Sequence, residues 1–287
     1  MATKGDRKPR NYYVDYTKGI RPRGKQYDNA KSNNCRYRET PDIAFGHRGF
    51  LITSMDEVKS YLEMRNILED YFEQLHKNDT EKSVVLSANQ SIEDDFEAEL
   101  KHLQKVRPFK QVKTHCRNTL FINIVEGFPD VDPVKIVDTF FDDMAARREM
   151  RSSNTFKVLP ILDTFRNSVA CAKESVGNLI KTRLADSSGP QKYFIEFQSR
   201  GNYKMCPEDK QKMIEEVANT IGSLKPEWTV SRDGADFMVV LVALKNVCCV
   251  SFLRDYFRRC KYNVIEYCKE FMPEIRSAES VQNDHES

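Results

Sequence analysis

The chain has 287 residues, 40% of them hydrophobic and 31% charged, with 45 lysines and arginines against 43 aspartates and glutamates. This length predicts about two domains, and the composition argues against a chain that is disordered throughout. The longest apolar run, residues 237–244, has eight residues, whereas a membrane-spanning helix needs about 20. We therefore expect no association with a membrane.

The net charge of +2 averages three unlike segments: residues 1–38 carry +8, residues 39–100 carry −10 and residues 101–287 carry +4. Such charge blocks are typical of interaction segments. The start of the chain lacks the apolar stretch of a secretory signal, so we interpret the eight cysteines as reduced thiols of an intracellular protein. No two of them form a C-x-x-C pair, and we expect no metal site.

The first half of the chain reads as a flexible basic arm followed by a small α/β unit. The arm covers residues 1–44, and residues 49–53 form a short apolar strand. Ser54 and Glu57 have the spacing of a capping box, and the apolar spacing that follows predicts a helix as far as Leu75. The polar residues 76–91 predict a loop.

The first unit continues with three further elements. Residues 92–104 predict an amphipathic helix, and residues 120–125 predict a strand buried on both faces. Asp132 followed by Pro133 is a favourable start for the next helix, whose apolar residues extend to Met144. The expected boundaries of this unit are residues 45–150.

The second half repeats the same kind of layout and ends in a polar tail over residues 273–287. Its apolar patterns predict strands and helices in the order strand, helix, strand, helix, strand, strand, helix. The respective ranges are 155–162, 169–183, 192–198, 207–224, 236–244, 247–253 and 263–271.

The motifs that mark common enzymes are missing from the sequence. It contains no G-x-G-x-x-G, no G-x-x-x-x-G-K-[ST] and no G-x-S-x-G. The acidic pairs Asp94-Asp95 and Asp142-Asp143 lie on expected helix surfaces, where solvated charge explains them. The adjacent Cys248 and Cys249 are interpreted as buried core residues. We expect neither catalysis nor a bound cofactor.

Basic residues gather in three places close to apolar strands: residues 101–117, residues 147–157 and residues 254–261. The third group lies beside Tyr256, Phe257 and Tyr262. Basic side chains can neutralise phosphates, and neighbouring aromatic rings can stack on unpaired bases. A single cluster is more often a solvated surface, but three clusters and a basic arm together favour nucleic-acid binding.

Three segments of the second half resemble a known family. Residues 156–161 (FKVLPI) resemble the strand that opens the central part of a THUMP domain, an RNA-binding module of tRNA-modifying proteins. Residues 194–202 (FIEFQSRGN) resemble its next strand and basic turn. Residues 238–251 (MVVLVALKNVCCVS), with residues 255–256 and 261–263 after them, are similar to the THUMP-domain adaptor of the eukaryotic tRNA cytidine acetyltransferase.

This resemblance implies a fold and a function. The implied fold is α/β, with an N-terminal ferredoxin-like domain (45–150) followed by a THUMP domain (151–272), and we expect no catalytic domain after it. The protein would be a non-catalytic adaptor in the nucleus or nucleolus that binds tRNA at the acceptor stem and 3′ end. It would present serine and leucine tRNAs to an RNA cytidine acetyltransferase for N4-acetylcytidine formation in the D-arm. The acetyl donor and nucleotide would bind that partner.

Eight residues are the expected RNA contacts: Arg148, Arg151, Lys157, Arg200, Asn202, Lys245, Arg258 and Lys261. Their role would be to fix the register of the RNA through its phosphates, while shape selects the RNA. Two alternatives stay open. One is an RNA-modifying enzyme with an unrecognised site, and the other is a protein-only scaffold whose acidic segment, residues 39–100, binds a basic partner.

Overall fold

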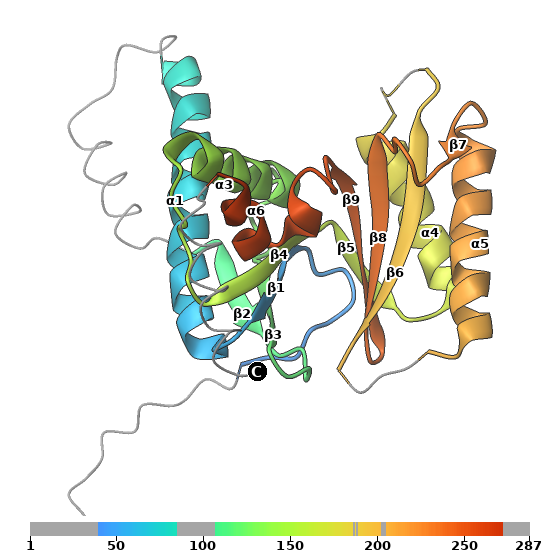
Figure 1. The fold of residues 1–287 in the computed structure, drawn as a ribbon, viewed down its shortest axis with the longest axis horizontal. Helices are drawn as coiled ribbons and strands as arrows, with labels where there is room; N and C mark the ends of the chain where they lie inside the picture. Colours follow the sequence, from blue (N-terminus) through green and yellow to red (C-terminus); the bar gives the residue numbers. More distant parts are fainter. Residues whose placement is uncertain (1–39, 85–106, 186, 188, 202–204, 272–287) are drawn as a thin grey trace, which may run out of the picture. The chain divides into compact units, whose positions relative to one another are not determined.

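The computed structural model describes residues 40–84, 107–185, 187, 189–201 and 205–271 (Figure 1). Two β-sheets with helices packed on them make up this part of the chain, so the predicted mixed α/β class is confirmed. The predicted helix over residues 92–104, the arm before Thr40 and the polar tail lie outside the described residues. Residues 40–44, the end of the predicted arm, are described, and Ile43 N donates to Lys113 O at 2.9 Å.

The first sheet has four antiparallel strands in the order β2-β3-β1-β4. Its strands are β1 (Gly49–Ser54), β2 (Phe109–Val112), β3 (Thr119–Ile124) and β4 (Thr155–Ile161). Its helices are α1 (Glu57–Val84) and α3 (Pro133–Arg147). Among the described residues the elements follow one another as β-α-β-β-α-β, the order that is also found in ferredoxin-like units.

Strand β4 corrects one expectation. It follows residue 150 and was expected to open the second unit, yet it pairs with β1 from Gly49↔Ile161 to Thr53↔Lys157. The reason is long-range packing, because Val158 and Ile161 are fully buried in the core of the first sheet. The pattern of a strand predicts its conformation but not its partner. The domain boundary at residue 150 stays a prediction, and the first sheet extends beyond it.

The second sheet has five strands in the order β5-β9-β8-β6-β7. They are β5 (Asp163–Arg166), β6 (Lys192–Arg200), β7 (Thr229–Val230), β8 (Phe237–Leu244) and β9 (Val247–Arg254). Strand β6 is parallel to β7 and β8, and the remaining pairs are antiparallel. Helices α4 (Val169–Arg183) and α5 (Pro207–Leu224) pack on one face of this sheet (Figure 1).

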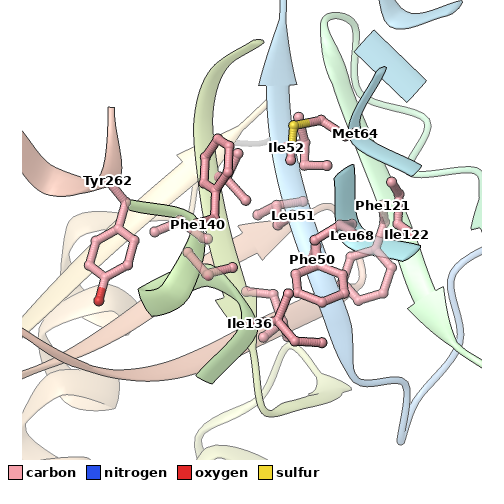
Figure 2. Packing of buried hydrophobic residues seen from close by; sticks show 14 of the residues in the cluster. Phe50, Leu51, Ile52, Met64, Leu68, Phe121, Ile122, Ile136, Phe140 and Tyr262 are labelled. Carbon is pink, nitrogen blue, oxygen red and sulfur yellow. The ribbon is translucent and has the colours of Figure 1, made fainter. Parts of the chain in front are cut away.

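Alternation along β8 divides the buried residues between two cores. Val239 and Leu241 face α4 and α5 in one cluster, whereas Val240 and Val242 belong to the cluster of the first sheet. Both faces of β8 are therefore covered, as its unbroken apolar run predicts. Figure 2 shows the first cluster gathered around β1, with residues of α1, β3 and α3 contributing.

After β9 the chain returns to the first unit, which the sequence did not predict. The 3-10 turn η1 (Cys260–Tyr262) and helix α6 (Val264–Phe271) pack against β4 and α3. Arg259 is 8% exposed and binds Asp138 and Asp142 on α3. The Tyr262 ring lies 5.2 Å from that of Phe141 and is part of the first cluster (Figure 2).

The helix boundaries confirm one sequence prediction and correct another. The Asp132 side chain accepts from Val134 N at 2.9 Å and caps α3, as predicted. The Ser54–Glu57 capping box is wrong, because Ser54 belongs to β1 and Asp56 accepts from the amides of Val58 and Lys59. Helix α1 also continues to Val84, so the loop predicted over residues 76–91 is wrong as far as residue 84. Long polar side chains lose little freedom in a helix, so a helix can continue without an apolar pattern.

Candidate nucleic-acid interface

Three of the predicted RNA contacts come together at one place. Lys157 lies on β4, Arg200 ends β6 and Lys261 lies in η1. Burial, first of all, and then the positive charges of Arg200 and Lys261 lower the pKa of Lys157 to about 8, while Glu196 opposes them. We call Lys157, Arg200 and Lys261 the basic cluster. Its three cations come from segments far apart in the sequence.

The basic cluster lies against an aromatic ring. The ammonium of Lys157 is 5.6 Å from the centroid of the Tyr256 ring, an attractive cation–π distance. The Gln198 side-chain amide donates to the Tyr256 hydroxyl at 3.2 Å. Burial and the neighbouring Glu196 carboxylate raise the pKa of Tyr256, which therefore stays a neutral phenol.

The sequence singled out Tyr256 beside the third basic group, but it did not single out Glu196 and Gln198 as part of this site. The alternation along β6 held the signal, because Glu196 and Gln198 fall on the same strand face as Arg200. This polar row on an otherwise buried strand marks a face that meets solvent or a ligand.

An unusual backbone presents Lys261. Cys260, Lys261 and Tyr262 have φ values of 49°, 56° and 62°, and left-handed backbone costs about 1–2 kcal/mol per non-glycine residue. Surrounding contacts hold the turn: Lys261 N donates to Tyr256 O at 2.7 Å, and Asn263 forms a β-bridge with Lys157. Backbone held in such sparsely populated conformations is concentrated at functional sites.

Lys245 and Arg200 both lie close to Cys116, which is in the loop between β2 and β3. Lys245 lies in the turn between β8 and β9, and both it and Arg200 act to lower the pKa of Cys116, which burial raises. Gly201 follows Arg200 with φ 69°, and a Cβ placed there would lie 3.0 Å from Cys116 Sγ. Glycine therefore allows the turn after β6 to approach this loop.

The remaining predicted contacts lie elsewhere or outside the described residues. Arg151 donates to Asp143 at 3.0 Å and to the Tyr71 hydroxyl at 3.1 Å, so it joins α1 to α3. Arg148 caps the end of α3 in a left-handed conformation and is exposed. Arg258 is exposed, and its positive charge acts to lower the pKa of Tyr267 on α6, which burial raises. Asn202 is not among the described residues.

The adjacent cysteines of β9 are core residues, as predicted, whereas Cys206 is exposed. Cys248 and Cys249 are fully buried in β9, and burial raises the pKa of both thiols. Within the described ranges, no three histidine, cysteine, aspartate or glutamate side chains are grouped so that they could hold a metal ion. Among the helices described, none combines the length and the apolar composition needed to cross a membrane.

No family model matches the chain. It is nevertheless similar along most of its length to proteins that carry a THUMP domain. THUMP domain-containing protein 1 of Mus musculus is 27% identical over 237 residues, which cover 78% of this chain and 65% of that protein. The human protein of the same name is 26% identical over 266 residues, covering 88% of this chain and 73% of that one. The chain thus spans about two thirds of the length of the mouse relative.

Solved structures give weaker similarities. The solution structure of the THUMP domain of THUMP domain-containing protein 1 is 23% identical, covers 29% of this chain and 85% of its own, and has a TM-score of 0.24. A 4-thiouridine synthetase in complex with RNA and ATP is 13% identical, covers 72% of this chain and 41% of its own, and has a TM-score of 0.37.

Proposed function

We propose that this chain is a THUMP-domain protein that binds tRNA through the basic cluster. The observation that carries the proposal is the convergence of Lys157, Arg200 and Lys261, close enough for two of them to lower the pKa of the third. A phosphate placed among these cations would relieve their repulsion and hold Lys157 in its charged form. The similarity to THUMP domain-containing protein 1 supports RNA as the ligand.

We further propose that the protein is a non-catalytic adaptor. It would present serine and leucine tRNAs to an RNA cytidine acetyltransferase in the nucleus or nucleolus, for N4-acetylcytidine formation in the D-arm. The resemblance of residues 238–251 to that adaptor family supports this role. The two-domain arrangement, ferredoxin-like followed by THUMP, belongs to the same proposal, and the strand order of the first sheet supports its first part.

Charge reversal tests the RNA site. The double variant Arg200→Glu, Lys261→Glu should lose two phosphate contacts, which at 0.1 M salt corresponds to roughly 50-fold weaker tRNA binding in a gel shift. The slope of log affinity against log salt should fall in magnitude by about 2. The matched control is Lys181→Glu, Lys212→Glu, which changes the net charge equally at exposed positions on α4 and α5, away from the cluster. Equal affinities of the two double variants would refute the site.

A reconstitution tests the adaptor role. Purified chain, tRNA, acetyl donor and ATP are incubated with and without the acetyltransferase, and the nucleosides are analysed by mass spectrometry. We expect N4-acetylcytidine only when both proteins are present. A modified nucleoside formed by this chain alone would favour the enzyme alternative, and tRNA binding that does not depend on salt would favour the scaffold.

A further inference from the structure

The start of α1 carries an apolar stripe on its exposed side. Met55 and Val58 are each 70% exposed and Leu62 is 48% exposed, and their spacing of three and four residues aligns them along the helix. Farther along the same side the exposed residues become polar, with Asn66 and Asp70. The other exposed large hydrophobic side chains of the described residues are scattered over other elements. We call Met55, Val58 and Leu62 the apolar stripe, since a grouped set of this kind marks an interaction site.

The backbone under the stripe is firmly held. Asp56 Oδ1 accepts from the amides of Val58 and Lys59, each at 3.1 Å, and so caps the helix. The hydroxyl of Ser60, which is fully buried, lies 2.7 Å from that of Thr155 on β4. A partner that binds a surface fixed in this way loses little free energy in ordering it.

A hollow adjoins the stripe. It has a volume of about 300 Å³ and is lined by Glu57 on one side and mainly by residues 111–117 on the other. Ser54 N donates to Asn118 O at 3.1 Å, and Glu57 Oε1 accepts from Asn118 N at 2.7 Å. These two bonds fasten the loop after β2 to the start of α1, so the hollow and the stripe lie next to each other.

The hollow carries positive charge that lacks an acidic partner. Lys113 and Arg117 are both exposed, and neither forms an ion pair within the part of the chain that the structure describes. His115 differs from them, because its Nε2 lies 2.9 Å from Asp42 Oδ1. We call this feature the basic hollow. An acidic group that approaches the stripe from this side would be attracted to it.

The aliphatic character of the stripe favours a protein over RNA as its ligand. Sites for unpaired RNA combine cations with aromatic rings on which bases stack, whereas Met55, Val58 and Leu62 have no ring. Apolar residues at this spacing on an exposed helix are instead the usual contact of a second helix. The neighbouring cations favour acidic residues along the flank of that second helix.

We propose that the apolar stripe and the basic hollow form a docking surface for an amphipathic helix of a partner protein, aliphatic on one face and acidic along its flank. The inference rests on the proposed function, in which this partner is the RNA cytidine acetyltransferase. The position suits an adaptor, because Thr53, just before the stripe, pairs with Lys157 of the basic cluster. A partner docked on the stripe is thus held close to the bound RNA.

Calorimetric titration of the full chain with the purified acetyltransferase, in the absence of RNA, measures the docking. Val58→Asp replaces an apolar contact by a charge that an acidic flank repels, so affinity should fall about 30-fold or more, the loss at an interface hot spot. An acidic residue in the first turn suits the helix dipole, so this variant should fold normally. Arg117→Glu should also weaken binding, and the affinity of the wild type should decrease with salt.

The matched control is Val230→Asp, the same substitution at another exposed valine, which lies on β7 of the second sheet and is 58% exposed. It should bind the acetyltransferase as tightly as the wild type does. In a gel shift the two aspartate variants should bind tRNA equally, because they carry the same net charge and leave the basic cluster intact. The urea midpoint of Val58→Asp should match that of the wild type, as expected for an exposed position.

Each competing explanation has its own outcome. A Val58→Asp variant that binds the acetyltransferase like the wild type overturns the docking surface and leaves the adaptor role in place, and affinity that does not depend on salt overturns the acidic flank. Weaker tRNA binding by Val58→Asp than by Val230→Asp would assign the stripe to RNA. A lower urea midpoint would assign it to a segment of this chain, and a wild-type dimer that Val58→Asp dissociates in size-exclusion chromatography would assign it to a second copy; each of these results overturns the proposal. A wild-type protein that does not bind the acetyltransferase overturns the adaptor role and the docking surface together.

Discussion

Lys157 combines two properties that rarely occur together in a lysine. It is buried enough for its pKa to fall to about 8, and it lies beside two further cations whose effect Glu196 opposes. An arrangement of this kind opposes folding, because the charged form is disfavoured in the folded protein. It is explained if the cluster exists to receive an anion.

The first residue-scale prediction concerns pH. Because the folded-state pKa of Lys157, about 8, is below its ordinary value of 10.5, folding releases a proton between these values. The contribution of Lys157 to stability should therefore rise with pH from about 8 to 10.5, since this lysine is protonated in the unfolded chain but not in the folded one there. RNA affinity should do the opposite and fall by up to about tenfold per pH unit above 8, as Lys157 loses its charge.

The measurement is tRNA affinity and urea unfolding as functions of pH. Lys157→Arg should remove the Lys157 contribution from both pH profiles, because a guanidinium keeps its charge throughout this range. The same substitution at Lys245 serves as the control and should leave them intact. A Lys157→Arg variant with the pH profile of the wild type would show that another group titrates.

At the scale of elements, local patterns were enough wherever the element is long and carries its own signals. The start of α3 at Asp132-Pro133, the apolar strands β8 and β9, and helix α5 from Pro207 all follow from the sequence. The strands β2 and β5 were missed, because four residues give too little periodicity to separate a strand from a loop. The capping box failed because Ser54 and Asp56 are both acceptable caps locally.

The contact between two turns gives an element-scale prediction. In Gly201→Ala the new Cβ would lie 3.0 Å from Cys116 Sγ and require a left-handed alanine, which should cost about 1–2 kcal/mol. Adding Cys116→Ala removes the sulfur atom, so the double variant should be more stable than the sum of the two single effects implies. Urea unfolding of the four proteins measures this coupling. Additivity within about 0.5 kcal/mol would mean that the two turns do not touch.

At the scale of the whole molecule, the sequence could predict the kind of residues in the candidate site but not which of them come together. The sequence pointed to basic residues near apolar strands, and Lys157, Arg200 and Lys261 do meet. Arg148 and Arg151 had equal standing in the sequence, yet Arg151 binds Asp143 and Tyr71. Which cations converge depends on the pairing of β4 with β1 and on the return of the chain after β9, and both are long-range events.

The two-sheet arrangement predicts how truncated chains behave. A fragment of residues 151–272 contains β4 without β1 and should not unfold cooperatively, because Val158 and Ile161 would lose their core. A chain that ends at Arg254 should also fail, since Tyr262, Val264 and Cys268 are fully buried in the first cluster. Thermal unfolding followed by circular dichroism and size-exclusion chromatography tests both. A cooperative transition in the 151–272 fragment would contradict the prediction.

The same return of the chain has a consequence for how the protein is made. A ribosome releases β1, α1 and α3 first, then the whole second sheet, and only at the end the residues from Arg259 to α6 that cover α3. Until they emerge, the apolar side of α3 around Phe141 lacks its final neighbours, a condition in which nascent chains attract chaperones or each other. The part of the molecule that is synthesised first is thus the part that is completed last.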